Sequence, residues 1–154
     1  MNQWQSEYLA IIKLFARELQ PTDDPIVRDV GRIVLRALRR FFPPVARDVR
    51  ALITSTADAK AVIATSYVNE TRFRDLLLFL YANSWLPNGE NRSLVLPTDS
   101  AWLQTNFPFA AAVLAADVAE FGTADSFSQE QKCAVNRRMA ANADAAADGR
   151  SCCA

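Results

Sequence analysis

Residues 26–42 read IVRDVGRIVLRALRRFF, and the interpretation of the whole chain starts from this stretch. Its apolar residues recur at spacings of three and four, which predicts an amphipathic α-helix with one face in the core. That face comprises Ile26, Val30, Ile33, Val34, Ala37, Leu38 and Phe41. The other side carries an arginine at every fourth residue, forming one stripe: Arg28, Arg32, Arg36 and Arg40. Because like charges one turn apart repel, the stripe indicates either an anionic partner or a solvated face balanced by carboxylates such as Asp29.

Helix signals continue on both sides of this stretch. Asp24 and Pro25 are typical of an N-cap and a first helical residue, and Pro43-Pro44 ends the helix. An earlier helix, ended by Gln20-Pro21, is predicted from the spacing of Trp4, Tyr8, Ile11, Ile12, Phe15 and Leu19. The short PTD turn between the two helices favours antiparallel packing.

The remaining segments are less uniform. Residues 45–53 fit a helical turn, whereas the β-branched stretch 61–68 fits a short strand. Asn69 caps a further predicted helix, with an inward face of Phe73, Leu76, Leu77, Leu80 and Trp85. A turn at 87–89 precedes an extended segment at 93–96. Alanine-rich residues 109–121 predict another helix, and the last begins at Ser126 and reaches about Ala143.

These elements predict a mainly all-α fold, an antiparallel helical bundle of about four to five helices with a minor short-strand element. We expect a single domain over residues 1–143 and a frayed tail over 144–154. The predicted core joins Ile12, Phe15, Ile33, Leu38, Leu76, Leu77 and Leu80.

Charge is uneven along a neutral chain. The 154 residues are 51% hydrophobic and carry 17 basic and 17 acidic side chains, so the net charge predicts no nucleic-acid partner. Residues 25–50, however, hold seven arginines against two aspartates. From residue 117 onward, six acids face four bases. Fourteen of the basic residues are arginine, which favours bidentate contacts with phosphate or carboxylate.

Several kinds of chemistry are missing from the sequence. There is no histidine, no glycine-rich phosphate loop, no CxxC pair and no metal-ligand cluster. Three cysteines, Cys133, Cys152 and Cys153, do not make a disulfide framework and indicate a reducing compartment. We therefore expect no enzymatic activity, cofactor, metal or small-molecule substrate. No signal peptide or membrane span is expected either, because the longest near-apolar run, 107–116, is well short of about 20 residues.

Three local features resemble the coat proteins of rod-shaped plant RNA viruses, the tobamovirus type. The first is a pair of N-terminal helices whose arginine-bearing second member runs into RALRRFFPP. The second is the leucine-rich helix VNETRFRDLLLFLYANSW. The third is Asn91-Arg92 followed by alternating apolar residues and Pro97-Thr98. The resemblance covers about residues 5–98; beyond it, the segment SAWLQTNFPFAAAVLAADVAEF lacks the family's basic and acidic pairs and is interrupted by Pro108.

The resemblance implies a structural capsid protein that self-assembles into a helical rod around single-stranded genomic RNA, in the virion and the host cytoplasm. It carries over RNA contacts only to Arg92 and its neighbour Asn91, whereas the stripe of Arg28, Arg32, Arg36 and Arg40 is a separate candidate for RNA binding. The alternative is a helical adaptor or regulatory domain whose arginine-striped helix binds an acidic protein partner. A flexible-filament coat protein is a third possibility.

Overall fold

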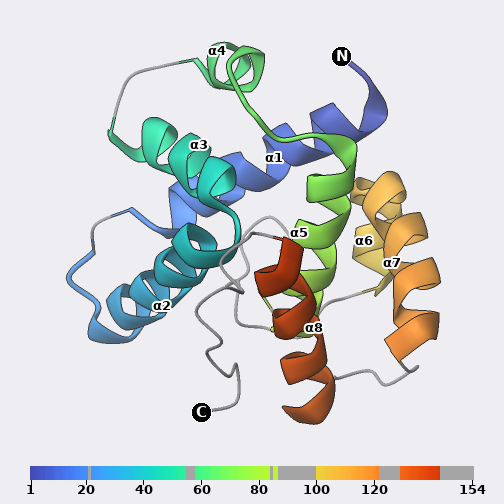
Figure 1. The fold of residues 1–154 in the computed structure, drawn as a ribbon. Coiled ribbons are helices and arrows are strands. Elements are labelled where there is room, and N and C mark those ends of the chain that lie inside the picture. Colours follow the sequence, from blue (N-terminus) through green and yellow to red (C-terminus); the bar gives the residue numbers. More distant parts are fainter. Residues whose placement is uncertain (21, 55–57, 84, 87–99, 122–128, 143–154) are drawn as a thin grey trace. The chain divides into compact units, whose positions relative to one another are not determined.

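The computed structural model describes residues 1–154 except 21, 55–57, 84, 87–99, 122–128 and 143–154. The described part contains eight helices: α1 (Gln3–Glu18), α2 (Pro25–Phe41), α3 (Pro43–Thr54), α4 (Ala59–Ala64), α5 (Glu70–Ala82), α6 (Ser100–Asn106), α7 (Pro108–Phe121) and α8 (Gln129–Asn142) (Figure 1). None of the described residues forms a β-strand. The predicted all-α fold is therefore confirmed.

The short strand predicted at 61–68 is wrong. Asp58 caps α4, its side chain accepting a hydrogen bond from the Lys60 amide at 3.2 Å, so the segment begins as a helix despite its β-branched residues. The extended segment predicted at 93–96 lies outside the described residues. The antiparallel bundle arrangement stays a prediction.

The chain divides into two compact units, Met1–Arg72 and Phe73 to the C-terminus. The expectation of one domain over 1–143 stays a prediction, and the predicted tail at 144–154 lies outside the described residues. The first unit contains α1 to α4. Within it α3 contacts α1, α2 and α4, so α3 is the central helix of this unit (Figure 1).

The connection between α2 and α3 is one residue long. The Asp24 carboxylate caps α2 by accepting from the Ile26 and Val27 amides at 2.9 and 3.4 Å, as predicted. At the other end Phe42 is the C-cap, and Pro43 already begins α3. The proline pair thus ends one helix and starts the next, because proline is tolerated in the first turn but not in the interior.

Only part of the predicted apolar face of α2 is buried. Val34, Leu38 and Phe41 are in the core, but the Ile33 side chain is 56% exposed and Ile26 is 75% exposed. The inclusion of Ile33 in the predicted core is therefore wrong. The buried residues Gly31, Val34, Leu38 and Phe41 recur at spacings of three and four, so they form a stripe next to the one through Ile26 and Ile33. The apolar arc of α2 is wider than the surface that the first unit covers.

A buried carboxylate connects three segments of the first unit. Asp48 of α3 is 2% exposed, and its Oδ2 accepts hydrogen bonds from the Tyr8 hydroxyl of α1 and from the Ser66 hydroxyl, both at 2.6 Å. Its Oδ1 lies 3.5 Å from the Arg47 guanidinium, which also donates to the Thr65 carbonyl at 3.1 Å. Because the charge is paired and hydrogen-bonded, its burial is tolerated and fixes α1 and the segment after α4 onto α3.

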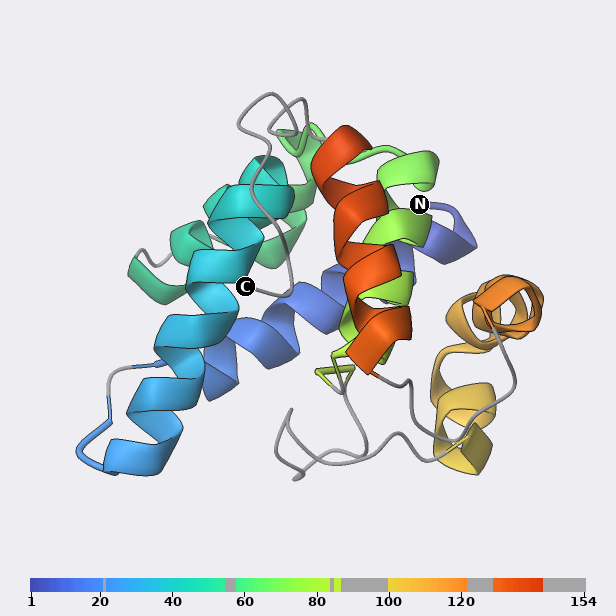
Figure 2. The same cartoon turned by 60° about the horizontal axis from the view of Figure 1, so that its bottom comes forward.

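The second unit is organised by α5 and α8, which lie side by side (Figure 2). The Asn83 amide donates to the Asn136 side chain at 3.4 Å, and the Arg138 guanidinium lies 3.7 Å from the buried Asp75 carboxylate. Aromatic rings add contacts elsewhere in the unit: Phe73 stacks on Phe109 of α7 with centroids 6.0 Å apart. Of the predicted inward face of α5, Phe73, Leu76, Leu77 and Leu80 are buried, and Trp85 is half-buried beyond the helix end.

Replacing Leu77 with alanine tests the core of the second unit. Leu77 is 0% exposed, so we expect Leu77→Ala to lower the free energy of unfolding by about 2–5 kcal/mol, the sum of lost apolar transfer and a residual cavity. The exposed Ile26→Ala is the control and should change stability by less than about 0.5 kcal/mol in dilute protein. Chemical denaturation measures both, and equal effects would contradict the burial of Leu77.

The Tyr8–Asp48 hydrogen bond predicts a loss of stability in alkali. Burial, and then the hydrogen bond and the charge of Asp48, raise the pKa of the Tyr8 phenol above its ordinary value of 10.0. The unfolded chain therefore loses this proton first, and the stabilisation is complete below pH 10 and falls as the pH rises further. Relative to Tyr8→Phe, which has no such proton, the unfolding free energy of the wild type should fall by about 1.4 kcal/mol per pH unit above 10. If the unfolding free energies of the two proteins changed with pH in parallel above pH 10, this account would be contradicted.

Candidate functional site

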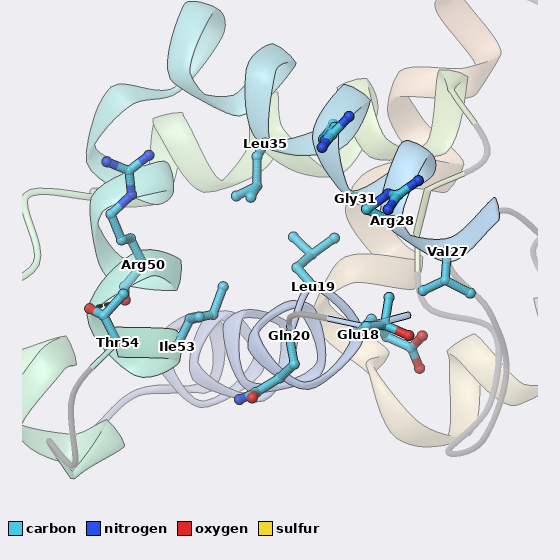
Figure 3. Close-up of a pocket in the computed structure, with 12 residues that line it drawn as sticks. Glu18, Leu19, Gln20, Val27, Arg28, Gly31, Leu35, Arg50, Ile53 and Thr54 are labelled. Atoms are coloured by element: carbon cyan, nitrogen blue, oxygen red, sulfur yellow. Dashed lines mark hydrogen bonds between the residues drawn. The ribbon is translucent and has the colours of Figure 1, made fainter. Parts of the chain in front are cut away.

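A pocket of about 230 Å³ opens where α1 ends, beside the N-terminal half of α2 and the C-terminal turn of α3. Leu19, Leu35 and Ile53 point into it from these three elements (Figure 3). Gly31 allows the close approach of α2, because a Cβ at this position would lie 3.3 Å from the Leu19 Cδ2. The lining is completed by Glu18, Gln20, Thr22, Val27, Arg28, Arg32, Arg50 and Thr54.

Three arginines from two helices meet at this pocket. Arg28 and Arg32 come from α2 and Arg50 from α3, and Figure 3 shows Arg28 and Arg50 on opposite sides of the opening. Two members of the predicted stripe, both on α2, therefore line a pocket whose interior wall is apolar. A ligand held here would contact guanidinium groups at the rim and aliphatic side chains inside.

The pocket arginines are only weakly neutralised. Arg28 and Arg32 lie 3.9 and 4.0 Å from the same Asp29 carboxylate, and all three side chains are about half exposed or more. Exposed pairs at this distance contribute little, at most about 1 kcal/mol. Among the described residues, the Arg50 guanidinium has no hydrogen-bond or ion-pair partner.

Negative groups also contribute to the pocket. Glu18 lines it, 3.9 Å from the Arg17 guanidinium, and the C-termini of α1 and α3 each add about half a negative charge. Asp29 does not line the pocket but lies beside Arg28 and Arg32, so the positive charge of the lining is available to a ligand only because these two contacts are weak. An anion in the pocket would replace Asp29 as the partner of Arg28 and Arg32.

The other residues of the predicted stripe do not join this pocket. Arg36 is exposed, one turn beyond Arg32. Arg40 is half-buried, with its guanidinium carbon 5.1 Å from the Phe41 ring centroid and its Nε buried without a hydrogen-bond partner among the described residues. The stripe is therefore divided between a pocket, solvent and an aromatic contact. Asn91 and Arg92 lie outside the described residues.

Arg72 and Arg74, which the sequence places on either side of Phe73, both lie over aromatic rings. The Arg72 guanidinium lies 4.9 Å from the Phe42 ring centroid and donates to the Phe41 carbonyl at 2.8 Å. It thereby satisfies a carbonyl at the C-terminus of α2, where a cation is also favoured by the helix dipole. The Arg74 guanidinium lies 5.5 Å from the Phe109 centroid. Neither arrangement indicates a ligand site.

The buried titratable groups have structural partners. Besides Asp48 and Asp75, Glu7 is 3% exposed and accepts from the Gln3 amide at 2.7 Å. No group of three potential metal ligands occurs among the described residues. Cys133 is buried and disulfide-bonded, a state that the reducing compartment expected from the sequence disfavours, and Cys152 and Cys153 lie outside the described residues. In that described part, no helix is long and apolar enough to cross a membrane.

Comparison of the chain with known protein families, with curated proteins and with solved structures found no match. The resemblance to rod-shaped virus coat proteins therefore rests on its sequence motifs alone.

Sequence reasoning did not single out Arg50 as a site residue. The sequence predicts a helical turn for its segment, 45–53, but does not predict which way this turn runs relative to the arginine-bearing helix. The signal that could have placed it is Pro43-Pro44, which is as typical of a helix start as of a helix end. A helix beginning there returns along α2 and brings Arg50 to the level of Arg28 and Arg32.

Proposed function

We propose that this protein is a structural capsid protein that self-assembles into a helical rod around single-stranded RNA. The observation that carries the proposal is the meeting of Arg28, Arg32 and Arg50 at one pocket with weak neutralisation. Packaging RNA of any sequence needs phosphate contacts more than base recognition, and arginine forms such contacts in bidentate geometry. The motifs shared with rod-shaped virus coat proteins, including Asn91 and Arg92, support the same function.

The zero net charge of the chain also supports this proposal. Many copies packed side by side would accumulate repulsion if each carried a large charge, whereas a neutral subunit with its arginines concentrated in one region avoids this. The RNA then supplies the negative charge that this region lacks. The arginines of this region are exposed and weakly paired, so breaking their ion pairs with protein carboxylates in order to bind phosphate costs little free energy.

The second candidate is a helical adaptor that binds an acidic protein partner. The apolar wall of Leu19, Leu35 and Ile53 favours it, because an aliphatic or aromatic side chain beside a carboxylate would fit the same pocket. Electron microscopy of the purified protein with and without RNA separates the two. Rods that protect RNA from nuclease support the capsid, and a monomer that leaves RNA unprotected at every pH and salt concentration would contradict it.

Salt dependence identifies the arginines that contact phosphate. Each lost phosphate contact should reduce the slope of log affinity against log salt by about 0.7 on single strands. We expect this reduction for Arg50→Ala at the pocket and for Arg92→Ala at the position shared with the family. Arg36→Ala is the matched control, since Arg36 is exposed on α2 outside the pocket. If Arg36→Ala lowered the slope of log affinity against log salt and the other two variants left it unchanged, RNA would bind a different face of α2 from the one proposed.

The lysine variant distinguishes charge from geometry at Arg50. Lysine keeps the charge but lacks the planar pair of donors, so Arg50→Lys should weaken RNA binding less than Arg50→Ala. Fluorescence anisotropy with a labelled oligonucleotide measures both. Equal losses for the two variants would show that the guanidinium geometry, and not the charge, is what the RNA requires.

A further inference from the structure

The interior of the pocket between α1, α2 and α3 has an aliphatic lining that a phosphate group would not use. Leu19, Leu35 and Ile53 are half-buried and point into the pocket, and Val27, which also lines it, is 41% exposed (Figure 3). Because a phosphate has no apolar part, RNA held by the arginines of the pocket would leave these carbon atoms in water. A ligand that covered them would bind more tightly, since apolar surface would be removed from water.

The shape and chemistry of the lining favour an aliphatic chain over a planar ring. No aromatic side chain occurs among the described residues that line the pocket. Proteins hold the bases of single-stranded nucleic acids mainly by stacking them on aromatic rings, and the pocket offers none of these. An apolar cavity of about 150 Å³ accommodates benzene. The pocket is about half as large again, at about 230 Å³, so it accommodates a chain of about nine carbon atoms.

The charges at the opening select the other end of the ligand. Arg50 lies on the opposite side of the opening from Glu18 (Figure 3), and its guanidinium has no hydrogen-bond or ion-pair partner among the described residues. Arg28 and Arg32, in contrast, share the Asp29 carboxylate. A carboxylate, with one charge and two oxygen atoms, matches a single guanidinium. Beside Arg50 it meets an arginine without a described counterion and lies away from the negative charge of Glu18.

We infer that the pocket binds a small aliphatic carboxylate, of the class of medium-chain fatty acids. The carboxylate accepts hydrogen bonds from the Arg50 guanidinium, and the chain covers Leu19, Leu35 and Ile53. This binding does not depend on the proposed packaging of RNA. One consequence of it does rest on that proposal: because Arg50 is also proposed to contact phosphate, the bound carboxylate competes with RNA for this arginine.

The experiment is calorimetric titration of the full chain with butanoate, hexanoate, octanoate and decanoate. Each methylene that enters the pocket should raise the affinity about two- to fourfold, and the increase should stop at about nine carbon atoms, when the pocket is full. Octylammonium has a chain of similar length and the opposite charge, so it should bind at least about fivefold more weakly than octanoate. An affinity that is independent of chain length, or equal for octanoate and octylammonium, would overturn the inference.

Variants of the aliphatic wall test where the chain lies. Leu35→Gln keeps the length and helix propensity of the side chain but makes it polar, so the gain per methylene should fall below about twofold. Ile53→Thr makes the same test from α3 and keeps the β-branch. Ile33→Gln is the matched control, because Ile33 is 56% exposed on α2 and does not line the pocket. A loss in Ile33→Gln as large as that in Leu35→Gln would place the chain elsewhere and overturn the inference.

The Arg50→Ala variant tests where the carboxylate lies. It should lower the affinity for every acid of the series by a similar factor, about fivefold, and leave the gain per methylene unchanged. Arg36→Ala is the matched control and should change neither quantity, because Arg36 does not line the pocket. Octanoate affinities that are equal for Arg50→Ala and the wild type would overturn the assignment of the carboxylate to Arg50.

Competition with RNA separates this inference from the proposed function. The affinity for a labelled oligonucleotide is measured with and without octanoate at constant ionic strength, because added salt alone weakens RNA binding. If octanoate binds and weakens RNA binding, both proposals are supported. If octanoate binds and RNA binding is unchanged, the inference holds and the pocket is not the RNA site. If RNA binding requires Arg50 but none of the carboxylates binds, the inference is overturned and the proposed function keeps its support.

Discussion

The first unit depends on one buried negative charge. The Asp48 carboxylate of α3 accepts hydrogen bonds from the Tyr8 and Ser66 hydroxyls and pairs with the neighbouring Arg47 guanidinium, so α1 and the segment after α4 are both attached to α3. Removing one partner of such a group costs more than the bond itself contributes, because the charge stays buried with fewer hydrogen bonds. Apolar packing alone would allow α1 to shift along α3, whereas directional bonds at 2.6 Å fix its register. The position of Leu19 at the pocket, at the far end of α1, follows from this register.

The polar network and the arginine surface lie on the same helix, α3. Asp48 faces the core while Arg50, two positions on, points to the pocket, as the helical geometry requires for residues about 200° apart. A helix held rigidly by its buried side therefore sets the position of the exposed guanidinium. Precise placement of a binding group is easier on such an element than on a loop.

Helical periodicity and capping residues predicted the all-α class and five of the eight described helices, α1, α2, α5, α7 and α8, whereas the expected total of four to five helices was too low. Asp24 and Asn69 cap the N-termini of α2 and α5, as predicted. The leucines of α5 are buried, as their helical spacing predicts. The errors have physical reasons. The β-branched residues after Ala61 favoured a strand, but the Asp58 cap favours a helix there. Ile33 has the spacing of a core residue, yet spacing defines only an apolar face and not how much of that face a neighbour covers.

The single residue between α2 and α3 has a consequence for how the chain folds. From Pro25 to Thr54 only Phe42 is outside a helix, so the two helices meet after closing almost no loop, and the entropic cost of loop closure is small. Contacts so close in sequence form early in folding. During synthesis this hairpin would already be complete when the later, acidic residues leave the ribosome, since chains fold from the N-terminus as they emerge. The basic surface would then exist before the part of the sequence that balances its charge.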